Sequence, residues 1–306
     1  MSQTVEDLRK KIDELDNKIH DLLMERADLV VEIGESKKKN KVQVVQPDRE
    51  AIMIRRLLNR HKGPLPKEAV VRIWRELVGA VSLLQTGLKV VVTVPEDQTG
   101  LTYWDMAKDY FSSVLPMNKA VNPLVALSMV REGETTFAVL PWPADGQGNQ
   151  WWTFLVNENP ENPMRIMARL PLGTRSRPEA NSDRPALVVA RVKYETTGDD
   201  NSFIALVLDQ SISRAKIVDK ARALGMEALS LNSSPARDGR LTLNLLEVKS
   251  YVGADDERLQ KLLDSLDYSE GKAVCLGGYP VPPIYEDKVG KNAAPETDQV
   301  AQKKQA

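Results

Sequence analysis

The feature that most constrains this 306-residue chain is an apolar repeat near its start. Between residues 5 and 40, Leu, Ile and Val recur mostly at steps of three and four, with neither Gly nor Pro before Gly34. This spacing predicts one amphipathic helix about 50 Å long at about 1.5 Å per residue. Thr4 and Asp7 resemble a capping box at its start, with Asp in place of Glu or Gln. The apolar positions are Leu8, Ile12, Leu15, Ile19, Leu22, Leu23, Leu29, Val30 and Ile33.

Two shorter helices follow the long one. Pro47 lacks a backbone donor, so it ends the first helix and suits the first turn of the second. The second helix runs to Gly63, and the third ends before Gly87. Because a helix of the predicted length cannot bury its stripe against two shorter neighbours, we expect an intertwined homodimer. The alternative is a bend near Gly34 that folds the helix back on its own subunit.

The pattern changes at Leu88. There LKVVVTVPE predicts a strand, WDMAKDYFSSVL a helix and TTFAVLPWP another strand, which is an α/β order. Residues 143–183 are rich in Pro, Asn, Gly and Asp, and predict loops with short strands such as WWTFLV. From Ser202 the segments predict βαββαβ, a ferredoxin-like unit. The tail from Glu286 is charged and predicted to be disordered. The predicted class is therefore multi-domain, α followed by α+β.

Composition limits the classes of partner and site. A net charge of −1 with 28% charged residues gives no basic field that would favour nucleic acid or an anionic membrane. Cys275 is the single cysteine and there are two histidines, which argues against a disulfide framework and a zinc site. We expect no metal and no cofactor. With no signal peptide and no membrane-length apolar run, a soluble cytoplasmic protein is predicted.

Several polar side chains fall inside or beside the apolar stripes of the predicted helices, where surface charge is not expected. Arginines can grip carboxylates in a bidentate geometry, Lys and Gln can donate to an ether or carbonyl oxygen, and Glu can accept from a hydroxyl. A site that binds carboxylates and donates hydrogen bonds, but has no nucleophile, suits a reaction that needs only positioning and electrostatic stabilisation. The alternative is a solvated helix face. The residues are Arg9, Arg26, Lys37, Arg49, Glu50 and Gln85.

The same residues stand in a recognisable order. The pattern LRxxIDxLDxxIxxLLxxRxxL, then IGxxK, then PDREAxxIRRL and a closing LLQ resembles the all-helical chorismate mutase family (AroQ type) over residues 5–86. The resemblance implies rearrangement of chorismate to prephenate in an intertwined homodimer. It implies that Arg26 and Arg9, the latter from the partner subunit, hold the two carboxylates. It also implies that Lys37 and Gln85 donate to the ether oxygen.

In the same resemblance, Glu50 accepts from the ring hydroxyl and Arg49 supports the cluster. Two substrate-binding positions depart from the family pattern. Val81 stands where a small hydroxyl residue is usual, with Ser82 one step away. Gln46 stands where an acidic residue is common. Both changes weaken substrate binding in this interpretation, and neither removes the donors to the ether oxygen.

The remainder resembles a bifunctional mutase–prephenate dehydratase that ends in an ACT domain. LGGYPVP at 276–282, SLNSSP at 230–235, VVTVPEDQTGLTYWDMAKDYF at 91–111 and AVLPWPADG at 138–146 echo its motifs. The residues that carry the chemistry in those family motifs are replaced in this chain. A Thr-Arg-Phe element becomes Asp183-Arg184-Pro185, a Glu-Asn-Ser triplet becomes Pro143-Ala144-Asp145, and a Gly-Ala-Leu loop becomes Ile212-Ser213-Arg214.

The sequence therefore predicts a chorismate mutase domain at 1–87 and a truncated dehydratase-like α/β region at 88–195. An ACT-like regulatory or structural domain follows at 196–285, with a disordered tail at 286–306. The predicted activity is chorismate mutase in aromatic amino-acid biosynthesis, without dehydratase activity. A working bifunctional enzyme and a non-catalytic regulatory protein of the aromatic pathway remain as alternatives.

Overall fold

The computed structural model describes residues 4–39, 46–94, 99–144, 150–159, 161–175, 185–236 and 239–285. Within these ranges, the side chains of Lys38, 83–86, 99–101 and Arg175 are not described. Asp145, Asp183, Arg184 and the tail from Glu286, on which sequence predictions rested, lie outside the described residues.

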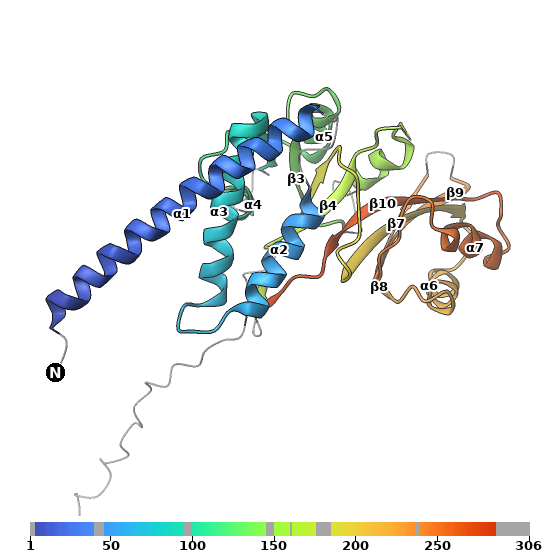
Figure 1. Ribbon diagram of the computed structural model, residues 1–306. Helices are drawn as coiled ribbons and strands as arrows, with labels where there is room; N and C mark the ends of the chain where they lie inside the picture. The colour runs from blue at the N-terminus through green and yellow to red at the C-terminus, as the bar shows by residue number, and fades with distance from the viewer. Residues whose placement is uncertain are drawn as a thin grey trace, which may run out of the picture.

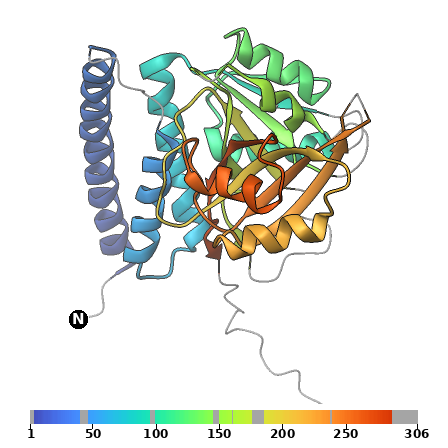
Figure 2. The ribbon, with the colours of Figure 1, turned by 90° about the vertical axis from the view of Figure 1, so that its right-hand side faces the viewer.

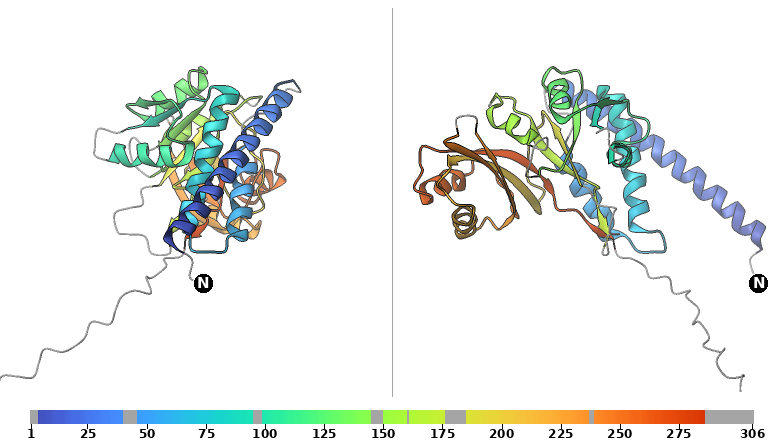
Figure 3. Two further views of the ribbon diagram at one scale, coloured as in Figure 1. Left: turned by 60° about the vertical axis from the view of Figure 1, so that its left-hand side comes forward. Right: turned by 180° about the vertical axis from the view of Figure 1, so that it is seen from behind.

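The chain opens with the three predicted helices, α1 (Val5–Lys39), α2 (Pro47–Arg60) and α3 (Lys67–Thr86). Thr4 and Asp7 cap α1 reciprocally, with Asp7 N donating to Thr4 Oγ1 at 3.2 Å and Thr4 N to Asp7 Oδ2 at 3.1 Å. The helix continues through Gly34 without interruption, so the alternative of a fold-back there is wrong. Its N-terminal half projects away from the rest of the molecule (Figures 1 and 3).

The projecting half of α1 leaves its apolar stripe in solvent. Leu8, Ile12, Leu15, Ile19 and Leu22 are each 46–63% exposed. The C-terminal half of the helix contacts α3 instead, and Gly34 is buried there. The stripe predicted from periodicity is therefore present, but the subunit itself does not cover it.

Beyond residue 87 a nine-stranded mixed sheet forms, in the order β2-β1-β3-β6-β4-β10-β7-β9-β8. β1, β2 and β3 pair in parallel, β6 pairs antiparallel with β3 and β4, and β10 joins β4 to β7. The strands are β1 (Val90–Thr93), β2 (Met117–Ala120), β3 (Phe137–Pro141), β4 (Arg165–Leu170), β6 (Ala186–Ala190), β7 (Asp200–Asp209), β8 (Ala228–Pro235), β9 (Leu241–Val248) and β10 (Lys272–Pro280). A two-stranded sheet pairs β5 (Thr174–Arg175) with β11 (Ile284–Tyr285).

The helices of this part are α4 (Thr99–Phe111), α5 (Pro123–Arg131), the 3₁₀ helix η1 (Trp151–Asn157), α6 (Arg214–Ala223) and α7 (Glu257–Ser265). From β7 to β10 the chain runs β7-α6-β8-β9-α7-β10, and its strands lie in the order β10-β7-β9-β8 with antiparallel neighbours. α6 and α7 lie on one face of these strands (Figures 1 and 2).

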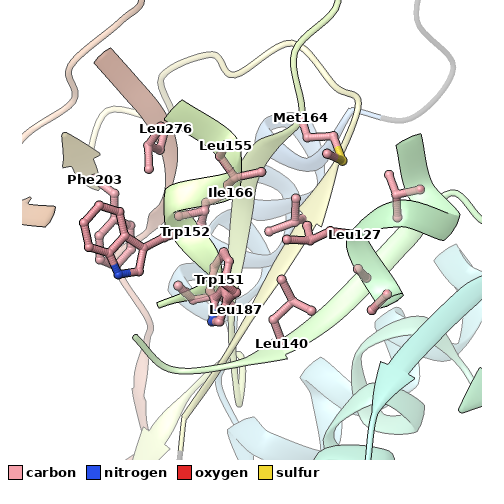
Figure 4. Close-up of a cluster of buried hydrophobic side chains, with 14 of the residues drawn as sticks. Leu127, Leu140, Trp151, Trp152, Leu155, Met164, Ile166, Leu187, Phe203 and Leu276 are labelled. Carbon is pink, nitrogen blue, oxygen red and sulfur yellow. The ribbon is translucent and has the colours of Figure 1, made fainter. Parts of the chain in front are cut away.

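One predicted element is wrong. WWTFLV forms η1 and not a short strand, because its large side chains are needed on one side of the core. Trp151 is 2% exposed and donates from Nε1 to Pro141 O at 2.9 Å, and Trp152 is fully buried. Packing here overrides the usual preference of aromatic residues for strands. Figure 4 shows both indoles among Leu127, Met164, Phe203 and other apolar side chains.

No helix among the described residues is both long enough and apolar enough to cross a bilayer.

Candidate functional site

A cavity of about 410 Å³ lies among α1, α2 and α3. Its walls are formed by the C-terminal half of α1, the start of α2 and the last turns of α3. The structure thus brings together side chains that are far apart in the sequence. The predicted site residues on its surface are Arg26, Lys37, Gln46, Arg49, Glu50 and Val81.

Local sequence explains why these side chains point inward. Arg26, Val30, Ile33 and Lys37 follow one another at steps of three and four, so they share one face of α1. Pro47 fixes the start of α2, which places the following Arg-Glu pair in its first turn. On the α1 wall of the cavity, two cationic side chains therefore flank two apolar ones.

Lys37 is half-buried and donates from Nζ to Gln46 Oε1 at 2.7 Å. Gln46 is the N-cap residue of α2, yet its side chain makes no capping bond. Its amide oxygen accepts from Lys37 instead. Partial burial and the positive charge of Arg49 lower the pKa of the Lys37 ammonium, while Glu50 and Asp48 oppose the shift.

Glu50 pairs with a residue that sequence reasoning missed. Arg75 Nη1 lies 2.7 Å from Glu50 Oε2, with the two side chains 5% and 21% exposed. Glu50 lines the cavity, whereas Arg75 lies behind it and also contacts α4. Arg75 could have been singled out because it interrupts the apolar run VVRIWRELV, but nothing in the sequence indicates its partner.

Two predicted residues are not placed in the cavity. Arg9 is 72% exposed, 3.9 Å from Glu6 Oε2, and about 25 Å from Arg26 along α1 at about 1.5 Å per residue. The Gln85 backbone is in the last turn of α3, but its side chain lies outside the described atoms.

Additional residues line the cavity that were not predicted as site residues. Arg56 extends the basic wall of α2 by two turns beyond Arg49. Ser82 reaches the cavity together with Val81, so a hydroxyl is present one position from where the family pattern places it. The polar part of the lining therefore consists of four cations, two uncharged groups that can donate hydrogen bonds and one carboxylate, and six apolar side chains form the rest.

Helix α4 packs tightly against α3 beside this cavity. A Cβ on Gly79 would lie 1.9 Å from Phe111 O, so only glycine allows the approach. Ser112 Oγ and Ser113 N donate to Glu76 at 2.9 Å and 3.1 Å. Burial opposes ionisation of Glu76, but the hydrogen bonds from Ser113 and Ser112 prevail and lower its pKa.

Residues 8–86 match the family model described as Chorismate mutase type II. A bifunctional chorismate mutase/prephenate dehydratase from Aquifex aeolicus is 34% identical over 116 residues, which cover 35% of this chain and 32% of that protein. The protein of the same description from Pseudomonas aeruginosa is 25% identical over 295 residues, covering 92% of this chain and 75% of that one. The chain spans about a quarter to a third of the length of the first curated relatives it matches.

Among solved structures, prephenate dehydratase from Streptococcus mutans superposes with a TM-score of 0.44 at 14% identity, covering 65% of this chain and 99% of that chain. The family match coincides with the helices that enclose the charged cavity. Residues 8–86 of this chain are therefore similar in sequence to chorismate mutase type II domains.

Proposed function

We propose that this protein is a chorismate mutase, an isomerase that converts chorismate to prephenate. One observation carries the proposal: Arg26, Lys37, Arg49 and Glu50 line a single cavity within the segment that matches the mutase family. The rearrangement is intramolecular and needs neither a nucleophile nor an external acid. Holding the substrate in a reactive conformation and stabilising developing charge are therefore sufficient.

Each cavity residue has a role in this proposal. Arg26 grips a carboxylate, because a guanidinium offers paired donors in a fixed plane, and Arg49 supports the cluster. Lys37 donates to the ether oxygen, where negative charge grows as the C–O bond breaks, and Gln85 is the second donor. Glu50 accepts from the ring hydroxyl. Gln46 orients Lys37, while Val81 contacts substrate without adding a hydrogen bond.

The proposed assembly is a homodimer with shared sites. The exposed stripe on α1, with five apolar side chains 46–63% exposed, is the surface that a second α1 would cover. Arg9 lies too far from its own cavity to reach a substrate there. A second copy packed along α1 would bring its Arg9 to the cavity and complete the carboxylate clamp.

For the remainder we propose a dehydratase-like α/β region at 88–195 and an ACT-like unit at 196–285. The order β10-β7-β9-β8, with α6 and α7 on one face, supports a ferredoxin-like arrangement for the second. Arg214 Nη1 donates to Ser233 Oγ at 3.4 Å, and its Nη2 donates to Leu231 O. A guanidinium thus lies between the two segments that echo the family's amino-acid site, which supports a structural role over phenylalanine binding.

The test is to incubate the purified protein with chorismate and to follow prephenate and phenylpyruvate separately. Prephenate without phenylpyruvate above the spontaneous background is expected. Phenylpyruvate formation would instead support the bifunctional alternative. No prephenate would contradict the mutase proposal and favour a non-catalytic regulatory protein. We place the protein in the cytoplasm, where chorismate metabolism would supply its substrate.

A further inference from the structure

Arg75 is the most deeply buried charged side chain beside the cavity, with 4% of the residue exposed. Burying a guanidinium destabilises the folded chain unless its donors are satisfied. Arg75 uses its donors on two different parts of the molecule. Nη1 pairs with Glu50 at 2.7 Å, and Nε donates to Tyr110 O at 2.7 Å.

A third contact fixes the plane of the same group. The Arg75 guanidinium carbon lies 3.9 Å from the centroid of the Tyr110 ring. Such stacking favours a cation over an aromatic face, most strongly when water is excluded. Tyr110 is itself 5% exposed, and burial raises the pKa of its hydroxyl to about 12, so the ring remains neutral at ordinary pH.

These contacts have a consequence for Glu50. Its Oε2 is held by Arg75, which leaves Oε1 as the oxygen able to accept from a ligand in the cavity. The orientation of Glu50 therefore depends on Arg75, and that of Arg75 depends on α4. Helix α4 follows β1 in the chain and belongs to the part of the molecule outside the matched mutase segment.

We propose that Arg75 is a positioning residue of the mutase site, and that Tyr110 of α4 holds it in place. The α/β region then contributes to mutase catalysis by fixing Glu50, although it touches no substrate. This inference rests on the proposed mutase function and assigns to that region a role its altered dehydratase motifs do not provide.

The experiment is a double-mutant cycle in the full-length protein with Arg75→Met, Glu50→Gln and the combination. Arg75→Met is expected to lower kcat by about tenfold to a hundredfold, the scale set by small displacements of reacting groups, with a smaller change in KM. In the Glu50→Gln background, Arg75→Met should lower kcat little further, because the carboxylate that Arg75 orients is already absent. Additive losses would show a merely structural role and overturn the proposal.

Arg72→Met is the matched control. Arg72 lies one turn away on α3 and also bridges to α4, at 2.9 Å from Asp109, but both side chains are more than half exposed. Its loss should leave kcat unchanged. An equal fall in kcat in the two variants would also overturn the proposal.

Tyr110→Leu and Tyr110→Phe keep the proposal testable if Arg75→Met unfolds the chain, which circular dichroism will show. Leu removes the ring but keeps the carbonyl acceptor, so kcat should fall in the same direction and by less. Phe keeps both contacts and should behave as wild type. Unchanged kcat in Tyr110→Leu would refute the role of α4, whereas absence of wild-type turnover would instead contradict the mutase proposal and, with it, this inference.

Discussion

The helical region (residues 4–86) and the sheet region (residues 88–285) use their side chains in opposite ways. In the described part of the helical region, only four hydrophobic side chains are buried. They are Ile54, Leu58, Val71 and Val81. Its chemistry-bearing residues converge on a cavity instead. The sheet region buries three large apolar clusters, and all five residues of β6 are fully buried.

The difference teaches that the fold and the chemistry are carried by separate parts of this chain. The sheet region buries most of its apolar side chains in clusters that its own residues form. The helical region leaves its longest apolar surface in solvent and keeps its charged groups around a cavity, so it depends on neighbours. Those neighbours are α4 of the same chain and, in our proposal, a second copy of α1.

The largest loss of activity is expected from placing charged side chains in the exposed apolar stripe of α1. Ile12→Glu with Ile19→Glu places two carboxylates on the surface that the second copy would cover, so the dimer should dissociate. Mutase turnover should fall by more than about a hundredfold, because each site would lose the partner's Arg9 and its carboxylate contact. Light scattering and a chorismate assay measure the two outcomes.

Asn17→Glu provides the control for that prediction, since residue 17 lies on the opposite side of α1 at 3.6 residues per turn. It should leave both dimer and turnover intact. A monomeric wild-type protein with full activity would contradict the shared-site proposal.

Lys37→Ala is expected to lower kcat by about 10²–10³-fold, the usual loss when one preorganised donor to a developing negative charge is removed. Folding should be kept, because Lys37 is only half-buried and its described partner Gln46 remains accessible to water. Steady-state kinetics and a thermal melt distinguish the two effects. Near-normal turnover would remove Lys37 from the site.

Leu206→Ala tests the sheet region. Leu206 is fully buried among the side chains beneath α6 and α7, so the truncation should reduce the free energy of unfolding by about 2–5 kcal/mol. The kcat of the mutase should remain unchanged at temperatures where the chain is folded. Leu229→Ala, at a position 47% exposed, is the control and should cost much less. A selective loss of kcat in Leu206→Ala would show that the two regions are more tightly coupled than we propose.

Gln46→Glu should change the pH dependence of the mutase. In our proposal the ammonium form of Lys37 is the donor, so activity should fall as pH rises through its pKa. Because that pKa is lowered by burial and by Arg49, the fall should begin at lower pH than for an ordinary lysine. A carboxylate at position 46 favours the ammonium and should move the fall to higher pH. A pH–rate profile that is the same in both proteins would contradict this reasoning.

The smallest expected effect is at Val81. Val81→Ser adds a hydroxyl at the cavity wall, and KM for chorismate should fall by about fivefold, since one added hydrogen bond contributes on the order of 1 kcal/mol. Val81→Ala removes the methyl groups without adding the hydroxyl and serves as the control. An equal KM in the two variants would mean that no carboxylate lies within reach.

The sequence predicted the helices well because their determinants are local. Pro47, Gly63 and the step-three and step-four repeats act within a few residues of themselves, and the structure confirms all three helices. η1 was missed for the opposite reason: Trp151 is placed by Pro141 O and by apolar neighbours that come from several strands. Periodicity alone carries no information about such contacts.

The site shows the same limit. Six of the residues expected at the site line the cavity, because their spacing in the sequence places them on the facing sides of α1, α2 and α3. Arg75 was not predicted as a site residue, because its position depends on a contact with Tyr110, 35 residues later in the chain. Arg9 lies on the projecting half of α1, so its proposed role depends on a second subunit that covers this surface.

The contact between α3 and α4 determines where this chain can be cut. A fragment ending at residue 87 would respect the domain boundary predicted from the sequence. It would, however, remove the contacts that α3 makes with the end of α4, which join Gly79 to Phe111, Arg75 to Tyr110 and Glu76 to Ser112. A minimal recombinant mutase should therefore carry the chain through Ser113, together with β1, which supports α4. The functional boundary of the helical region thus lies just beyond the end of its neighbour's first helix.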